Sequence, residues 1–227
     1  MTRAHAHSPQ ATRIVTTHSA LAGLCPLIPV PFVDDMLARR IAERMHRSLF
    51  AAHDLELSHE GAEILTSGPS GWLRGAATAV ALFPLKKLVR KLVFVLAVKD
   101  CADVAAAVFH DGWLIAGLLA RPPADLSLTD RDTLKRVRAA MLSTYRDINP
   151  APLRHALAGA LLAARTGVVR AARRVRHADA APPDETVIEA MRAAAMTRWP
   201  YLERVERRFR EHLERPAAAD GDSRRAG

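Results

Sequence analysis

Residues 84–120 read PLKKLVRKLVFVLAVKDCADVAAAVFHDGWLIAGLLA, and this stretch decides the fold. On a helical wheel, the basic residues of its start gather on one side while apolar residues line the other. From Phe94 onward the basic side turns apolar as well, through Val98, Cys101 and Ala105. The pattern predicts one long helix that is amphipathic over residues 84–96 and buried on most of its circumference further along. The basic residues of its start are Lys86, Lys87, Arg90 and Lys91.

The composition indicates a helical protein with one core. The chain has 227 residues, of which 49% are hydrophobic but only 5% aromatic. A core built mainly from Ala, Leu and Val favours helices over sheets, and this length suits one domain. We therefore predict an all-α fold, a single bundle of about six to eight helices around a long central apolar helix. The helical domain is expected over residues 12–215, between disordered tails at residues 1–11 and 216–227.

Prolines, glycines and capping residues divide the chain into its helices. The prolines of residues 25–31 predict an extended connector, because a residue that precedes proline avoids helical geometry. Asp34 and Asp35 then suit the first turn of a helix, where carboxylates face the positive end of its dipole. A first short helix is expected to end near Leu24. Further helices are expected at about residues 34–53, 60–66, 131–146, 152–177 and 184–215, the last with a bend at Trp199 and Pro200.

The charge narrows the class of partner. The net charge is +9 and the isoelectric point is near 10.5, which favours an anionic membrane surface or a nucleic acid. Cys25 and Cys101 are far apart in apolar sequence, as expected of small buried side chains in a reducing compartment. Since the N-terminal sequence also lacks the pattern of a secretory signal, we predict a cytoplasmic protein.

The segment from Ile14 to Val33 is the only uncharged run as long as a membrane span. Polar residues occupy its start and three prolines interrupt its end, so a buried or interfacial turn is expected there instead. The basic start of the long helix is the better candidate for membrane contact. In this hypothesis the protein is non-catalytic and binds the inner face of a membrane, or a protein partner, through its four basic residues and adjacent apolar surface. The alternative is an ordinary core helix with a solvated basic face.

A second hypothesis is an enzyme of unknown class with a polar site on the long helix. Asp100, Asp103 and His110 fall within one sector of that helix, together with Lys99 and Asp111. Asp100 and Asp103 are close enough to share a cation, but His110 lies about 10 Å further along, too far for the same ion. The alternative is a stripe of ion pairs, with Lys99 bound to Asp103 and arginines supplied by a neighbouring helix.

Other motifs do not indicate a cofactor or a metal. The sequence HEGAE at residues 59–63 has a glutamate where a zinc-binding helix needs its second histidine, so no metal site is predicted. The chain also lacks a phosphate-binding loop, a nucleophile elbow and a CxxC pair.

Nucleic-acid binding is a third hypothesis. It rests on arginines that spread over about half of one predicted helix, with no interleaved aromatic residues. The C-terminal helix has three glutamate–arginine pairs at spacing four and is expected to neutralise its own charge. The candidate nucleic-acid residues are Arg165, Arg170, Arg173, Arg174 and Arg176.

Residues 21–45, LAGLCPLIPVPFVDDMLARRIAERM, combine a proline-rich turn with a helix that starts at two aspartates. This stretch resembles the corresponding turn of EcsC-like and YcjF-like helical bacterial proteins. The resemblance covers roughly a tenth of the chain and implies a helical, membrane-associated protein. Some members of those families accompany GTPase domains, but this sequence has no phosphate loop to which such an activity could be assigned.

Overall fold

The computed structural model describes residues 7–27, 33–67, 89–124, 126–164, 166–167 and 184–215, with residues 33–34 and 89–97 described by their backbone alone. Most of these residues are helical and none of them is in a strand, which confirms the predicted all-α fold. After α1 and the short 3-10 helix η1 come seven further helices in the described ranges. The bounds are α1 Pro9–Leu24, η1 Cys25–Leu27, α2 Val33–Ala51, α3 His59–Thr66, α4 Val89–Ala120, α5 Arg131–Asp147, α6 Ala151–Ala163, α8 Glu185–Met196 and α9 Trp199–Glu214.

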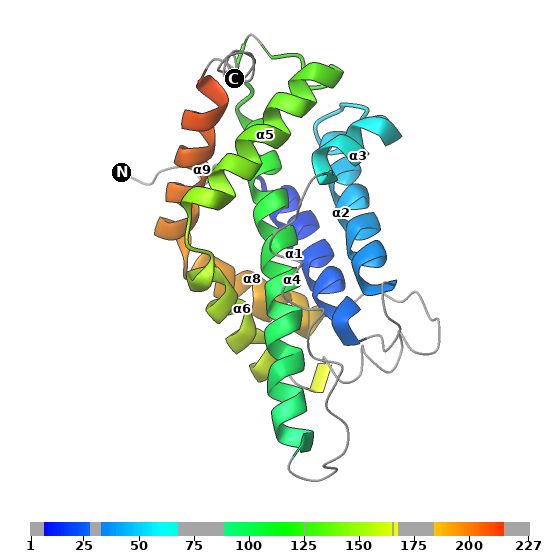
Figure 1. The fold of residues 1–227 in the computed structure, drawn as a ribbon, viewed down its shortest axis with the longest axis vertical. Helices are drawn as coiled ribbons and strands as arrows, with labels where there is room; N and C mark the ends of the chain where they lie inside the picture. Colours follow the sequence, from blue (N-terminus) through cyan, green and yellow to red (C-terminus); the bar gives the residue numbers. More distant parts are fainter. Residues whose placement is uncertain are drawn as a thin grey trace, which may run out of the picture.

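Helix α4 is the central element of the bundle, as its apolar sequence predicts. It contacts α1, α2, α6 and α9, while α5 packs on α3 and α9, and α8 packs on α1 and α6. Figure 1 shows α1 and α2 on one side of α4 and α6 and α9 on the other, with α8 running behind α4. Trp113, Leu114 and Ile115 are buried on three successive positions, so nearly the whole circumference of α4 is covered there.

One segment of the described residues, Val98–Ala120, has the length and hydropathy of a membrane span, and 83% of its most apolar window is buried inside the bundle. Packing against other helices therefore accounts for the apolar character of this part of α4.

Side-chain caps explain where several helices begin. Ser58 accepts a hydrogen bond from the backbone N–H of Gly61, and Asp184 accepts one from that of Thr186. Asp130 accepts two, from Asp132 and Thr133, at the start of α5. Each cap supplies a partner for an N–H group that the helix itself leaves unpaired.

The chain becomes helical earlier than predicted at its N-terminus. The predicted disordered tail extends to residue 11, but α1 starts at Pro9, where proline suits the first helical position. Ser8 caps this helix by accepting a hydrogen bond from the N–H of Ala11 at 3.0 Å. His7 is already buried, with 5% of its surface exposed. The predicted tail at residues 216–227 lies outside the described residues.

The helix predicted over residues 152–177 is interrupted after Ala163: residues 166–167 are helical again, and residues 165 and 168–177 lie outside the described residues. α6 ends at Ala163, and the N–H of Ala164 closes a tight turn onto the carbonyl groups of Ala160 and Leu162. The predicted bend at Trp199 is present as a turn between α8 and α9, where Pro200 takes an early position of the new helix.

Candidate functional site

Asp103 of α4 forms two ion pairs at the edge of the bundle. Asp103 accepts a hydrogen bond from Lys99 at 3.1 Å, and its other oxygen lies 3.3 Å from a guanidinium nitrogen of Arg154 on α6. Burial raises the pKa of the Asp100 carboxyl and Lys99 opposes that rise. Two contacts that the alternative interpretation of the polar stripe predicts are therefore present: Lys99 is bound to Asp103, and an arginine of a neighbouring helix pairs with the same carboxylate.

His110 lies deeper and joins α4 to α9. Its Nδ1 is 2.7 Å from the carbonyl oxygen of Ala106, so this nitrogen carries the proton and donates it. The other nitrogen, Nε2, then accepts a hydrogen bond from the hydroxyl of Tyr201 at 2.9 Å. Burial lowers the pKa of His110 to about 4, so the ring is neutral near pH 7.

The next residue, Asp111, ties α4 to α5. Its carboxylate accepts a hydrogen bond from the Tyr145 hydroxyl and lies 3.5 Å from a guanidinium nitrogen of Arg138. Arg138 is itself buried and donates from Nε to the carbonyl oxygen of Ser67 at 2.7 Å. Burial raises the pKa of Asp111, while Arg138 and Tyr145 lower it. This group joins α4 to α5, and each of its buried charges has an opposite partner.

His46 on α2 is a buried histidine of a different kind. Neither ring nitrogen has a hydrogen-bond partner among the described residues, and the side chain is inaccessible to solvent. Burial lowers its pKa to about 3, with a smaller contribution from the charge of the nearby Arg138. The neutral ring therefore behaves as a core side chain.

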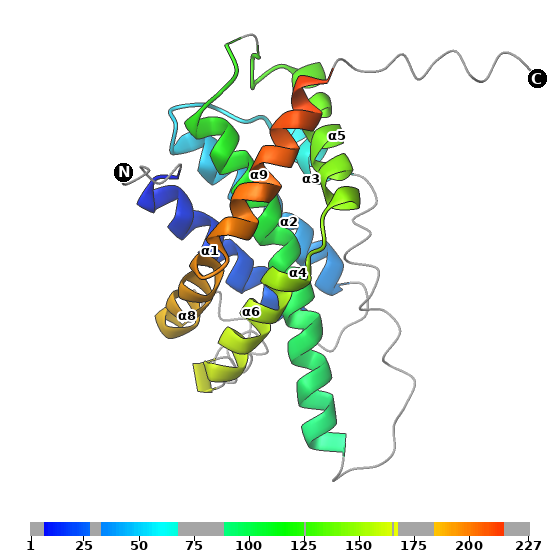
Figure 2. The ribbon, with the colours of Figure 1, turned by 90° about the vertical axis from the view of Figure 1, so that its left-hand side faces the viewer.

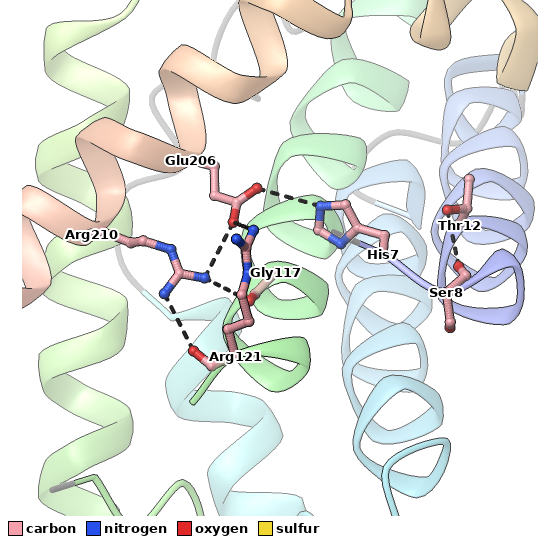
Figure 3. Close-up of polar contacts among 7 residues, drawn as sticks. All are labelled: His7, Ser8, Thr12, Gly117, Arg121, Glu206 and Arg210. Atoms are coloured by element: carbon pink, nitrogen blue, oxygen red, sulfur yellow. Dashed lines mark hydrogen bonds and ion pairs between the residues drawn. The ribbon is translucent and has the colours of Figure 1, made fainter. Parts of the chain in front are cut away.

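A second polar cluster lies where the segment before α1 meets α4 and α9, and Figure 3 shows its members converging on one carboxylate. Glu206 of α9 accepts hydrogen bonds at Oε1 from Arg121 at 2.9 Å and from Arg210 at 3.2 Å. Its Oε2 lies 3.6 Å from Nε2 of His7. Burial raises the pKa of the Glu206 carboxyl, but His7 and Arg210 outweigh this effect and hold it below its usual value.

The same cluster has an aromatic wall. The ring of His7 lies on that of Trp113, with centroids 3.7 Å apart and the planes inclined by 52°. Gly117 lies beside both side chains: a Cβ atom there would be 3.1 Å from Cε1 of His7 and 3.1 Å from Cδ of Glu206. Because residue 117 has no side chain, the imidazole of His7 and the carboxylate of Glu206 can both pack against the backbone of α4 there.

The structure does not bring the predicted enzymatic residues together. Asp103 contacts Lys99 and Arg154 near the surface, whereas His110 contacts Ala106 and Tyr201 in the core. In the parts of the chain that the structure describes, no three His, Cys, Asp or Glu side chains are grouped as metal ligands. His59 and Glu63 of the HEGAE sequence form an exposed pair at 3.7 Å.

The basic candidates lie mostly beyond what the structure describes. Lys86 and Lys87 are outside the described residues, and Arg90 and Lys91 lie in the first turn of α4 with only their backbone described. The residues of the nucleic-acid hypothesis, Arg165, Arg170, Arg173, Arg174 and Arg176, are also outside the described residues.

Several polar contacts have no signal in the sequence. The pairing of Glu206 with Arg210 follows from spacing four, but nothing in the sequence connects His7 with residues two hundred positions away. Tyr201 and Tyr145 likewise reach α4 from helices that only the tertiary fold places beside it. No family model matches the chain, and comparisons with curated proteins and with solved structures found no match.

Proposed function

We propose that this is a non-catalytic helical protein that associates peripherally with an anionic membrane through the basic start of α4. In this proposal Lys86, Lys87, Arg90 and Lys91 bind lipid headgroups, and the adjacent apolar residues of 84–96 enter the interface. A cytoplasmic protein at the inner face of a bacterial membrane would meet such lipids. The likeness of residues 21–45 to EcsC-like and YcjF-like proteins agrees with this proposal.

The observation that carries the proposal is the projecting end of α4. In both Figure 1 and Figure 2 its N-terminal turns extend beyond the ends of α1 and α6. The sequence there is basic on one side and apolar on the other, with VRKLVFVLA at residues 89–97. A helix start with this sequence pattern suits a lipid interface, and its lysines and arginines favour an anionic one.

The test is sedimentation with vesicles of increasing anionic lipid content. We expect the wild-type protein to bind more as the anionic fraction rises and less as salt is added. Replacing all four basic residues with glutamate should weaken binding by about 4 kcal/mol, at about 1 kcal/mol for each basic residue, which is roughly a thousandfold.

A matched control changes net charge by the same amount elsewhere. Arg40 and Arg47 on α2 and Arg204 and Arg207 on α9 are exposed, and their replacement with glutamate should preserve most of the binding. Negligible binding by the wild-type protein would contradict the proposal. An equal loss in both variants would show that net charge, rather than the basic start of α4, drives association. Residual binding to neutral vesicles or to a protein would identify what else the apolar residues of 84–96 bind.

A further inference from the structure

The surroundings of His7 have the form of a binding site rather than of a general core contact. Trp113 and Gly117 lie about one turn apart on α4. The indole of Trp113 contacts the ring of His7, and Gly117 has no side chain that would take up the space of that ring. Glu206 of α9 completes the site with one carboxylate oxygen directed at the ring nitrogen of His7, 3.6 Å away. The histidine side chain is only 2% exposed, so the site encloses the ring.

The walls of this site are held in place by contacts that do not involve His7. Arg121 and Arg210 both bind Oε1 of Glu206, which leaves Oε2 turned toward the imidazole. Arg210 also donates to the carbonyl oxygen of Gly117 at 2.9 Å and to that of Arg121 at 3.3 Å. The carboxylate and the glycine are therefore positioned by α4 and α9 themselves, as Figure 3 shows.

The occupant, in contrast, belongs to another part of the chain. His7 precedes the cap of α1, with only Ser8 between it and the first helical residue. From these observations we propose that Trp113, Gly117 and Glu206 form a binding site for an imidazole ring, which His7 fills in cis and which an imidazole-bearing small molecule fills when His7 is absent.

The chemistry of the walls defines this class of ligand. A flat ring fits between the indole and the glycine. Nε2 of His7 lies 3.6 Å from Oε2 of Glu206, just beyond hydrogen-bond distance, and has no hydrogen-bond partner among the described residues. In the proposed complex a free ring, which no backbone holds back, moves closer and donates its N–H to Oε2. Two guanidinium groups already neutralise the single carboxylate, so a neutral ring with one N–H donor suits the site better than an additional cation.

The experiment measures rescue of the full-length His7→Ala variant by free imidazole. Thermal unfolding is followed by circular dichroism at about pH 8.5, where free imidazoles are neutral. We expect the Tm of this variant to rise with the logarithm of imidazole concentration in the millimolar range, as for a ligand that binds only the folded state. The wild-type protein should show no rise, because its own histidine occupies the site.

Two comparisons distinguish the site from a general effect of the solute. The rise should be lost with 1-methylimidazole, which has no N–H at this pH. It should also be lost in the His7→Ala/Glu206→Leu double variant, which has no acceptor at residue 206 and is measured against its own baseline. His155→Ala, which removes an exposed histidine, should behave as the wild type does.

The results decide the proposal in each case. An equal rise in the wild-type protein, in the double variant or with 1-methylimidazole overturns it, and so does a folded His7→Ala variant that imidazole leaves unchanged. If the His7→Ala variant is unfolded at the start, recovery of its helical signal on addition of imidazole supports the proposal. Failure to recover that signal overturns it.

Discussion

Gly23 of α1 lies directly against Ala105 of α4. A Cβ atom at Gly23 would come within 2.9 Å of the Cβ atom of Ala105 and within 3.0 Å of the carbonyl oxygen of Cys101. The second contact is with backbone, which cannot turn aside as a long side chain can. The close approach of α1 to the central helix therefore depends on the missing side chain at Gly23.

Replacing Gly23 with alanine should separate these two helices and destabilise the protein. We expect the free energy of unfolding to fall by about 1–3 kcal/mol, as for overpacking elsewhere in protein cores. Urea denaturation followed by circular dichroism measures it.

Gly159 on α6 provides the matched control, because a Cβ atom there would meet nothing within 4 Å. Gly159→Ala should raise stability by about 0.5–1 kcal/mol, since alanine is the better helix former. Equal effects of the two substitutions would contradict the packing argument.

Of the polar links between α9 and α4, the hydrogen bond from Tyr201 to His110 is the one that is fully buried. In Tyr201→Phe, Nε2 of His110 loses that donor while the ring stays buried, and leaving such a group unsatisfied should lower stability by about 1–3 kcal/mol. The same urea measurement on His110→Leu and on the double variant checks the cause. The double variant should be more stable than the sum of the two single effects predicts, and strict additivity would contradict the link.

The spacing of apolar residues predicts the helices, and capping residues, prolines and glycines predict most of their ends. α5 begins one residue after Asp130, a residue type that caps helices, and α3 ends next to a run of serine, glycine and proline. Local sequence cannot show that the segment before α1 is anchored, because the residues that hold His7 belong to α4 and α9. That is why the predicted tail at residues 1–11 is too long.

Some polar contacts of α4 can be predicted from the sequence and others cannot. The pair of Lys99 with Asp103 is visible in the sequence because residues four apart share a helix face. The contact of Asp111 with Arg138 needs α5 to lie beside α4, and no spacing in the sequence specifies that arrangement. The identity of each buried partner therefore came only from the tertiary structure.

The two cysteines should resist thiol reagents in the folded protein. Cys25 and Cys101 are both buried, and burial together with Asp100 raises the pKa of Cys101 to about 12. Because the thiolate is the reactive form, labelling by iodoacetamide at neutral pH should be slow until urea unfolds the chain. Mass spectrometry of labelled peptides reports each site separately. Rapid native labelling of Cys101 would contradict its burial against α1.

Stability should fall in mild acid because two buried histidines stay neutral in the folded protein. Their pKa values are lowered from 6.5 to about 4 for His110 and to about 3 for His46, chiefly by burial. Below pH 6.5 the unfolded chain therefore binds protons that the folded chain does not, and the free energy of unfolding decreases as the pH falls. The decrease continues until the pH reaches the folded-state values.

His46 allows this effect to be isolated, because its ring has no hydrogen-bond partner among the described residues. His46→Leu should retain most of the stability at pH 7 and should lose about 2 kcal/mol less than the wild-type protein between about pH 7 and pH 5. Urea denaturation at the two pH values measures the difference, in which the contributions of the carboxyl groups cancel. His155→Gln, at an exposed position, should keep the full wild-type loss. If His46→Leu lost as much stability as the wild type, His46 would have to be protonated in the folded protein.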